Sequence, residues 1–201
     1  MTEAIFGLLG VLIGAGLTWY QTYWMNKKEV ERNARYLAIR VVCILDQYME
    51  SCAEVMNDNG LRFGDRSAEV QQEPRVEAPE APVYPEDVDW KSIDHELMYK
   101  ILAFPSEVNV WKRTSNEMWD IAQGTDLADW YSERAYWHSN YGLQAFKLSK
   151  ELGAKYGIKG KSYPAWKPEK DFTEKLDRFV TERGRRLAGY QEFLHKVYNR
   201  R

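Results

Sequence analysis

The sequence predicts an all-α fold, in which an N-terminal transmembrane helix continues into a cytosolic antiparallel helical bundle of about four main helices. Three observations predict this class. The chain begins with a long apolar stretch that carries no charged side chain. Apolar residues then recur at spacings of three and four along most of the remaining chain. No segment shows the alternating β-branched pattern that is typical of strands.

The predicted anchor comprises residues 1–25. From Ala4 to Met25 the chain reads AIFGLLGVLIGAGLTWYQTYWM. At about 1.5 Å per residue, such a helix matches the ~30 Å hydrocarbon core of a bilayer, where only a helix can satisfy its own backbone hydrogen bonds. A cleavable signal peptide is the alternative, but Glu3 is the only charged side chain ahead of the apolar run, where a signal peptide carries positive charge.

The residues at the C-terminal end of this stretch predict how it is oriented. Aromatic side chains that settle among lipid headgroups are followed by basic side chains that stay in the cytoplasm. We therefore predict a single-pass protein of the cell (inner) membrane, with its N-terminus outside and its C-terminal domain in the cytoplasm. The predicted interfacial residues are Trp19, Tyr20, Tyr23, Trp24, Lys27 and Lys28.

Small residues punctuate the apolar stretch. Gly10 and Gly14 form a Gly-x-x-x-Gly pair, and Gly7 lies on the preceding turn. Such residues let a second helix approach closely, so they predict helix packing within a homo-oligomer. The alternative is that glycine is simply common in membrane helices.

Residues 26–60 are predicted to form a juxtamembrane amphipathic helix, the first helix of the bundle. Its apolar stripe suits either a coiled-coil seam or a bundle face, and Ala38 and Leu45 widen it in favour of a bundle. The sequence Asn57-Asp58-Asn59-Gly60 predicts its end. Cys43 and Cys52 lie too far apart on one helix to form a disulfide and are predicted to be reduced packing residues.

Residues 61–88 differ in composition, because they are rich in proline and acidic side chains and poor in apolar ones. They predict a linker that is disordered or extended like polyproline. The remainder of the bundle, residues 89–201, is predicted to begin with Asp89 as an N-cap and to be broken or kinked near Pro105. A long helix then ends around Gly157, and a final helix follows Pro168.

No motif in the chain predicts a catalytic, metal or cofactor site. Gly160-Lys161-Ser162 lacks the earlier glycine and the preceding strand of a phosphate-binding loop. Glu192 and His195 have the Glu-x-x-His spacing of di-iron bundles, but a second such pair is missing. We therefore predict no cofactor, no metal and no enzymatic activity.

A partner surface is predicted on the last two helices. Trp130, Trp137 and Tyr141 share a face and suit a core, whereas other aromatic residues of that helix lie on different faces. From residue 157 onward twelve Lys and Arg stand against six Asp and Glu. This surface suits a protein partner or anionic lipid headgroups, and the alternative is a solvated, internally paired face. Its predicted residues are Tyr131, Tyr136, Arg178, Arg185 and Arg186.

The expected function is that of a membrane-anchored interaction, scaffold or sensor protein whose partners are the bilayer and a protein or a second copy. Nucleic acid is disfavoured, since the net charge is −2 and the aromatic helix carries mixed charge. The architecture resembles that of small bacterial or phage membrane proteins with a helical cytosolic domain, a likeness that implies no activity. The alternative function is a membrane-acting effector that oligomerises and perturbs the bilayer, as in defence or exclusion systems.

Overall fold

A computed structural model describes residues 2–61, 73–122 and 127–198, and the side chains of residues 12–61, 73–119 and 127–185. Within these ranges it contains the α-helices α1 (Thr2–Met56), α2 (His95–Ala122), α3 (Leu127–Tyr156) and α4 (Pro168–Tyr198). A single 3-10 turn, η1 (Trp90–Ser92), precedes α2, and the described residues contain no strand. The predicted all-helical class is confirmed.

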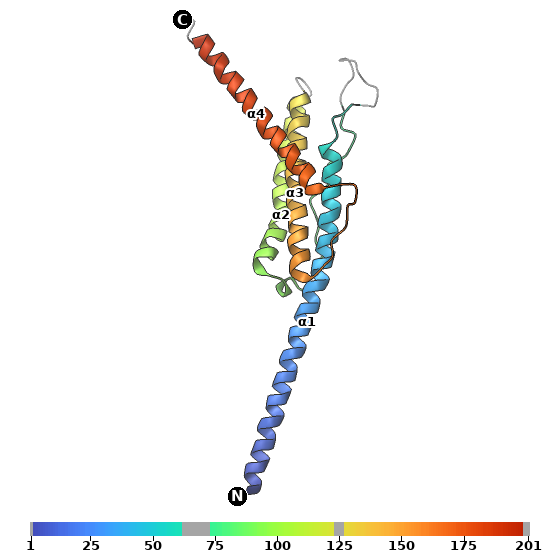
Figure 1. The fold of residues 1–201 in the computed structure, drawn as a ribbon, viewed down its shortest axis with the longest axis vertical. Coiled ribbons are helices and arrows are strands. Elements are labelled where there is room, and N and C mark those ends of the chain that lie inside the picture. Colours follow the sequence, from blue (N-terminus) through green and yellow to red (C-terminus); the bar gives the residue numbers. More distant parts are fainter. Residues whose placement is uncertain (1, 62–72, 123–126, 199–201) are drawn as a thin grey trace.

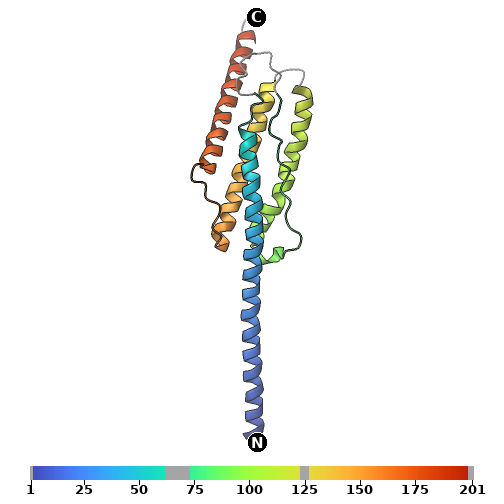
Figure 2. The same cartoon turned by 90° about the vertical axis from the view of Figure 1, so that its right-hand side faces the viewer.

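The C-terminal part of α1 packs beside α2 and α3, whereas its N-terminal part extends alone beyond the bundle (Figure 1). Figure 2 shows the projecting part of α1 from the side, with the two ends of the chain at opposite ends of the molecule. Helix α3 runs antiparallel to the other three, while α1 and α2 run parallel. A parallel pair needs a connection that returns along the bundle, and residues 73–94 run along that return path.

Helix α1 continues without interruption from the apolar stretch into the bundle, as predicted. Its C-terminal half is buried along one face because apolar residues recur there every three or four positions. The helix ends where the sequence predicts, and Gly60 adopts the left-handed φ of +72° that favours glycine. The fully buried members of this face are Leu37, Ala38, Val41, Leu45, Met49, Cys52 and Val55.

The sequence predicted a break or a kink near Pro105, and the break does not occur, because α2 runs through this proline. Proline removes one backbone hydrogen bond, but Phe104 and Val108 on either side are buried against the core and hold the helix in place. The start of α2 also differs from the prediction. Asp89 caps η1, whereas the carboxylate of Asp94 accepts the first free N–H groups of α2.

Residues 73–88 of the predicted linker lie extended along the bundle, and residues 62–72 lie outside the described residues. Three of their apolar side chains, Ala81, Tyr84 and Val88, are part-buried against the main core, whereas Val83 is exposed. The Trp90 ring, 6.0 Å from that of Tyr84, donates a hydrogen bond to the Pro85 carbonyl. The segment is therefore packed against the bundle and not surrounded by solvent, because the neighbouring helices offer an apolar surface to its apolar side chains.

The ends of α3 and α4 follow their local signals. Gly157 adopts a φ of +65°, and the Ile158 N–H reaches back 2.9 Å to the Gly153 carbonyl, which closes α3 in a Schellman motif. Pro168 begins α4, where a missing N–H costs nothing. The loop between them is tied to α1 because Lys161 and Tyr163 both bond to the Glu50 carboxylate.

Among the residues whose side chains are described, no helix is long and apolar enough to cross a membrane. Positions 4–11 of the predicted span lie outside those residues. The transmembrane prediction is therefore not confirmed.

Candidate functional site

The first candidate site is the projecting part of α1. From residue 12 to residue 32 every position is exposed, although many of the side chains are large and apolar. Leu12, Leu17 and Trp19 are 61%, 64% and 72% exposed. An added Cβ at Gly14 or Gly16 would meet no atom within 4 Å. An apolar helix surface of this size, uncovered by the described chain, is typical of a surface that contacts lipid or another protein.

The predicted interfacial aromatic residues lie on one side of the helix, because their positions fall at i, i+1, i+4 and i+5. The Trp19 and Tyr23 rings stack with centroids 6.1 Å apart, and Tyr20 meets Trp24 edge-on at 6.0 Å. The Lys27 ammonium lies 5.6 Å from the centre of the Trp24 ring. Each aromatic ring contacts the one a turn away, so the four form an aromatic cluster with basic residues directly after it. Of the predicted packing glycines, Gly14 is open to solvent, while the surroundings of Gly7 and Gly10 lie outside the described side chains.

A buried ion pair lies at the opposite end of the bundle. The Arg134 guanidinium on α3 donates to the Asp58 carboxylate at 3.0 Å and to the Val76 carbonyl, and the two charged side chains are 4% and 3% exposed. The backbone N–H groups of Arg75 and Val76 donate to the same Asp58 oxygen, and that of Gly60 to the other. This pair therefore fastens the acidic segment to α1 and α3.

Beside the ion pair lies a cavity of about 300 Å³ between α2, α3 and residues 74–80. Its walls are mainly aromatic, since Trp111, Trp119, Trp130, Tyr48 and Tyr141 line it. Arg134 and His138 supply its buried polar atoms, and Lys112 is paired with Glu80 on the opposite wall. This size and composition are typical of small-ligand sites.

His138 is held neutral in this cavity. Burial lowers the pKa of its imidazole to about 4. Its Nδ1 lies 2.7 Å from the Arg134 carbonyl, so Nδ1 carries the proton of the neutral ring and donates it. Nε2 is then a hydrogen-bond acceptor.

The predicted partner surface is only partly exposed. Tyr131 was predicted to lie on this surface, but the structure buries it: the residue is 6% exposed and packs against Gly60. Its hydroxyl is buried without a hydrogen-bond partner among the described residues. The reason is that the chain just after α1 covers that face of α3. Sequence periodicity within one helix does not indicate such a contact.

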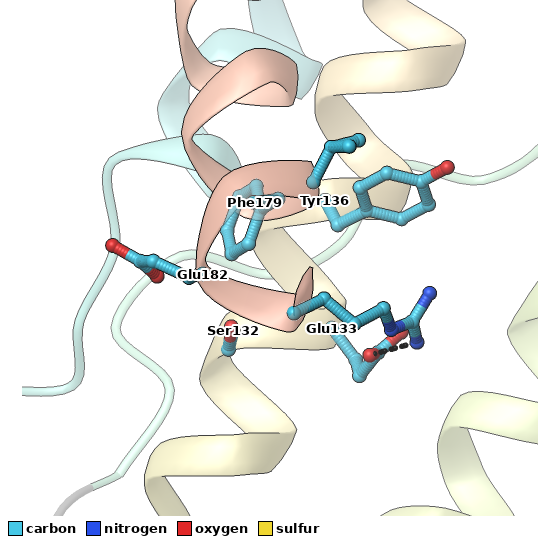
Figure 3. Close-up of a pocket in the computed structure, with 7 residues that line it drawn as sticks. Ser132, Glu133, Tyr136, Phe179 and Glu182 are labelled. Atoms are coloured by element: carbon cyan, nitrogen blue, oxygen red, sulfur yellow. Dashed lines mark hydrogen bonds and ion pairs between the residues drawn. The ribbon is translucent and has the colours of Figure 1, made fainter. Parts of the chain in front are cut away.

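Tyr136 lies at the junction of α3 and α4. Figure 3 shows its ring beside Phe179, with centroids 5.9 Å apart, at a small cavity of about 70 Å³. The Arg183 guanidinium is bonded to Glu133 across the same junction. Tyr136 therefore helps to attach α4 to α3, and its side chain is only part-exposed.

The predicted basic surface lies on α4. Arg178 and Arg185 are exposed, and Arg186 lies outside the described side chains. Helix α4 leads away from the end of the bundle that continues into the projecting helix (Figure 1). The helix that carries these arginines therefore runs away from the aromatic cluster of α1.

The sequence did not predict Asp58, Arg134 or His138 as site residues, and Asp58 was assigned only to a helix end. One signal was available, because Arg134 and His138 follow Trp130 at spacings of four on the face that carries Tyr141. A charged residue on an otherwise aromatic, buried face predicts a partner.

Two further findings concern metal-binding and thiol groups among the described residues. In the described part of the chain no three His, Cys, Asp or Glu side chains lie close enough to hold a metal ion. Burial raises the pKa of the Cys52 thiol to about 12, so this group is a thiol at neutral pH. No protein-family model matches the chain, and neither a curated protein nor a solved structure shows significant similarity to it.

Proposed function

We propose that this protein is a single-pass membrane-tethered interaction protein, which holds a helical bundle in the cytoplasm and presents it to a protein partner. The observation that carries the proposal is the projecting helix. Its Leu12, Ile13 and Leu17 are more than half exposed and have no cover from the described chain. In α1 the aromatic cluster is followed by basic residues, which is the order expected at the cytoplasmic border of a bilayer.

The length of α1 would hold the far end of the bundle at a distance from the membrane. From Trp24 to Met56 an α-helix rises about 48 Å. The end of the bundle that carries Asp58 and Arg134 would therefore stand far from the membrane. Electrostatic attraction fades over about 8 Å at physiological salt, so Arg178 and Arg185 suit a protein partner better than the anionic headgroups of the same membrane.

Alkaline carbonate extraction of cells that express the full chain tests the anchor. We expect the wild-type protein to stay in the membrane pellet, because its apolar helix is held by lipid. The double variant Ile13→Glu/Leu17→Glu is expected to move to the soluble fraction, since charged side chains are costly in hydrocarbon. Leu102→Glu is the matched control, because Leu102 is 47% exposed on the bundle and its substitution should leave the protein in the pellet. Release of the wild-type protein by carbonate would overturn the proposal.

A membrane-acting effector is the second candidate. The observation in its favour is the open surface at Gly14, which can accept another helix backbone at close range. Dye leakage from cells that express wild type or Gly10→Leu/Gly14→Leu separates the candidates. An effector requires leakage that the double variant reduces, whereas a tethered interaction protein predicts no leakage from either.

A further inference from the structure

The cavity beside Arg134 exists because two tryptophan pairs join α2 to α3. Trp111 stacks on Trp137 with centroids 5.0 Å apart, and Trp119 packs on Trp130 at 4.5 Å. The pairs lie about two turns apart along each helix, and the small Ser115 lies between them on α2. Large rings at both ends and a small residue in the middle leave a space that the helices cannot close.

The third wall holds that space open. Residues 74–80 are attached to α3 through the bond from Arg134 to the Val76 carbonyl, and to α2 through the ion pair of Glu80 with Lys112. The Trp130 ring N–H is also fixed, because it donates to the Ser115 carbonyl at 3.2 Å. The walls are therefore preorganised, which lowers the cost of binding a ligand.

The charges of the lining exclude anions. Asp58 neutralises Arg134, and Glu80 neutralises Lys112. Glu77 adds an exposed carboxylate to the lining. A ligand that enters meets aromatic faces and no unpaired cation, which suits a neutral, flat, aromatic group.

One polar feature selects among such ligands. Since the Nδ1–H of His138 is directed to the Arg134 carbonyl, the free acceptor that this side chain can offer is Nε2. An acceptor in an aromatic cavity favours a ring that carries an N–H or O–H donor.

We propose that this cavity is a binding site for a neutral planar aromatic group with one N–H or O–H donor, of the size of indole or phenol. The donor bonds to Nε2 of His138, and the ring lies between the tryptophan pairs. The group is either a free small molecule or the tryptophan or tyrosine side chain of a partner. This proposal does not depend on the membrane anchor.

Isothermal titration calorimetry of the purified full chain in mild detergent, with heats into detergent alone subtracted, tests the site. We expect indole to bind with a Kd of about 1 mM or below. 1-Methylindole, which lacks the donor, should bind about tenfold more weakly. Anionic indole-3-acetate should be weaker still. N-acetyltryptophanamide separates the two sources, because it binds as well as indole only if the cavity accepts a partner's side chain.

Two variants locate the binding. Ser115→Trp fills the space between the tryptophan pairs and should abolish indole binding. Glu117→Trp adds the same ring at an exposed position of α2 that does not line the cavity, and should bind as the wild type does. His138→Leu removes the Nε2 acceptor and supplies no other, so indole and 1-methylindole should then bind equally.

The proposal is overturned if the wild-type protein binds none of the probes, or if Ser115→Trp binds indole normally. It is also overturned if the wild-type protein does not distinguish indole from 1-methylindole. Thermal unfolding shows whether each variant is folded. If Ser115→Trp does not fold, NMR of the wild-type protein decides the location. Indole must then shift the ring N–H resonances of Trp111, Trp119 and Trp130, and unchanged resonances contradict the site.

Discussion

The carboxylate of Asp58, two residues after the end of α1, lies 3.0 Å from the guanidinium of Arg134 in the N-terminal third of α3, and water reaches almost none of either side chain. Burial acts to raise the pKa of Asp58, but the N–H groups of Gly60, Val76 and Arg75 and the Arg134 guanidinium outweigh it, so the pKa falls below its usual value. The pair connects the end of α1, the extended segment and α3 through one charged group.

Removing one partner of this pair should be costly. For Arg134→Met we expect a loss of about 3–5 kcal/mol in the free energy of unfolding, because the Asp58 charge is then buried without its counterion. Urea denaturation measures this loss. Arg183→Met is the control, since Arg183 is 61% exposed in its bridge to Glu133. An exposed bridge contributes at most about 1 kcal/mol.

Hydrogen exchange of the Arg134→Met variant adds a local readout. The amides of Arg75 and Val76 both donate to Asp58, so their protection should fall more than that of core amides in α3. Equal losses of stability in Arg134→Met and Arg183→Met would contradict the role of the buried pair.

His138 should make stability depend on pH. Burial lowers its pKa to about 4 in the folded protein, against about 6.5 in the unfolded chain. Between these values the unfolded state binds more protons, so this contribution is fully present above pH ~6.5 and is lost as the pH falls towards 4. From pH 7.5 to pH 5 we expect a loss of about 2 kcal/mol from this group.

Urea denaturation of the wild type and of His138→Asn at both pH values measures the effect. The asparagine variant cannot take up a proton, so its stability should change less over the same range. His95 provides the control, because it is an exposed residue at the start of α2 and His95→Asn should keep the wild-type pH dependence. A wild-type dependence that survives in His138→Asn would assign the effect to other groups.

Two helical glycines should respond in opposite directions to alanine. A Cβ at Gly142 in α3 would lie 2.5 Å from the Phe172 ring, which is fully buried where α4 joins the bundle. A Cβ at Gly184 in α4 would meet nothing within 4 Å. Gly142→Ala should therefore displace α4 and destabilise the protein by about 1–3 kcal/mol.

Gly184→Ala should instead stabilise α4 by up to about 1 kcal/mol, through helix propensity alone. Thermal unfolding compares the two variants with the wild type. If Gly142→Ala were as stable as Gly184→Ala, the close packing of Phe172 on α3 would be refuted.

The sequence predicted those helix ends that depend on the conformational preferences of neighbouring residues. The end of α1 at Asn57–Gly60, the end of α3 at Gly157 and the start of α4 at Pro168 depend on the conformational preferences of one or two residues. The core face of α1 was readable for the same reason, since helical periodicity places Leu37, Val41 and Leu45 on one side.

The wrong predictions concern residues whose surroundings come from a distant segment of the chain. A break or a kink at Pro105 was expected because proline disrupts an isolated helix, but the helix is unbroken and Phe104 is held in the core by Tyr48, with rings 5.5 Å apart. Tyr131 was expected on the surface because it lies off the face that carries Trp130, Trp137 and Tyr141, whereas Gly60, just after α1, packs against its ring.

By itself, the sequence determined the helical class, the end of α3 near Gly157, the start of α4 near Pro168 and the continuity of α1, because backbone preferences and apolar spacing act over a few residues. Only the tertiary structure decided that residues 73–88 pack along the bundle and that Asp58 meets Arg134. It alone also places His138 in an aromatic cavity. These features depend on contacts between separate segments, such as the bonds of Arg134 to Asp58 and Val76, which lie 76 and 58 positions away. The pattern of a single segment does not encode which distant surface will meet it.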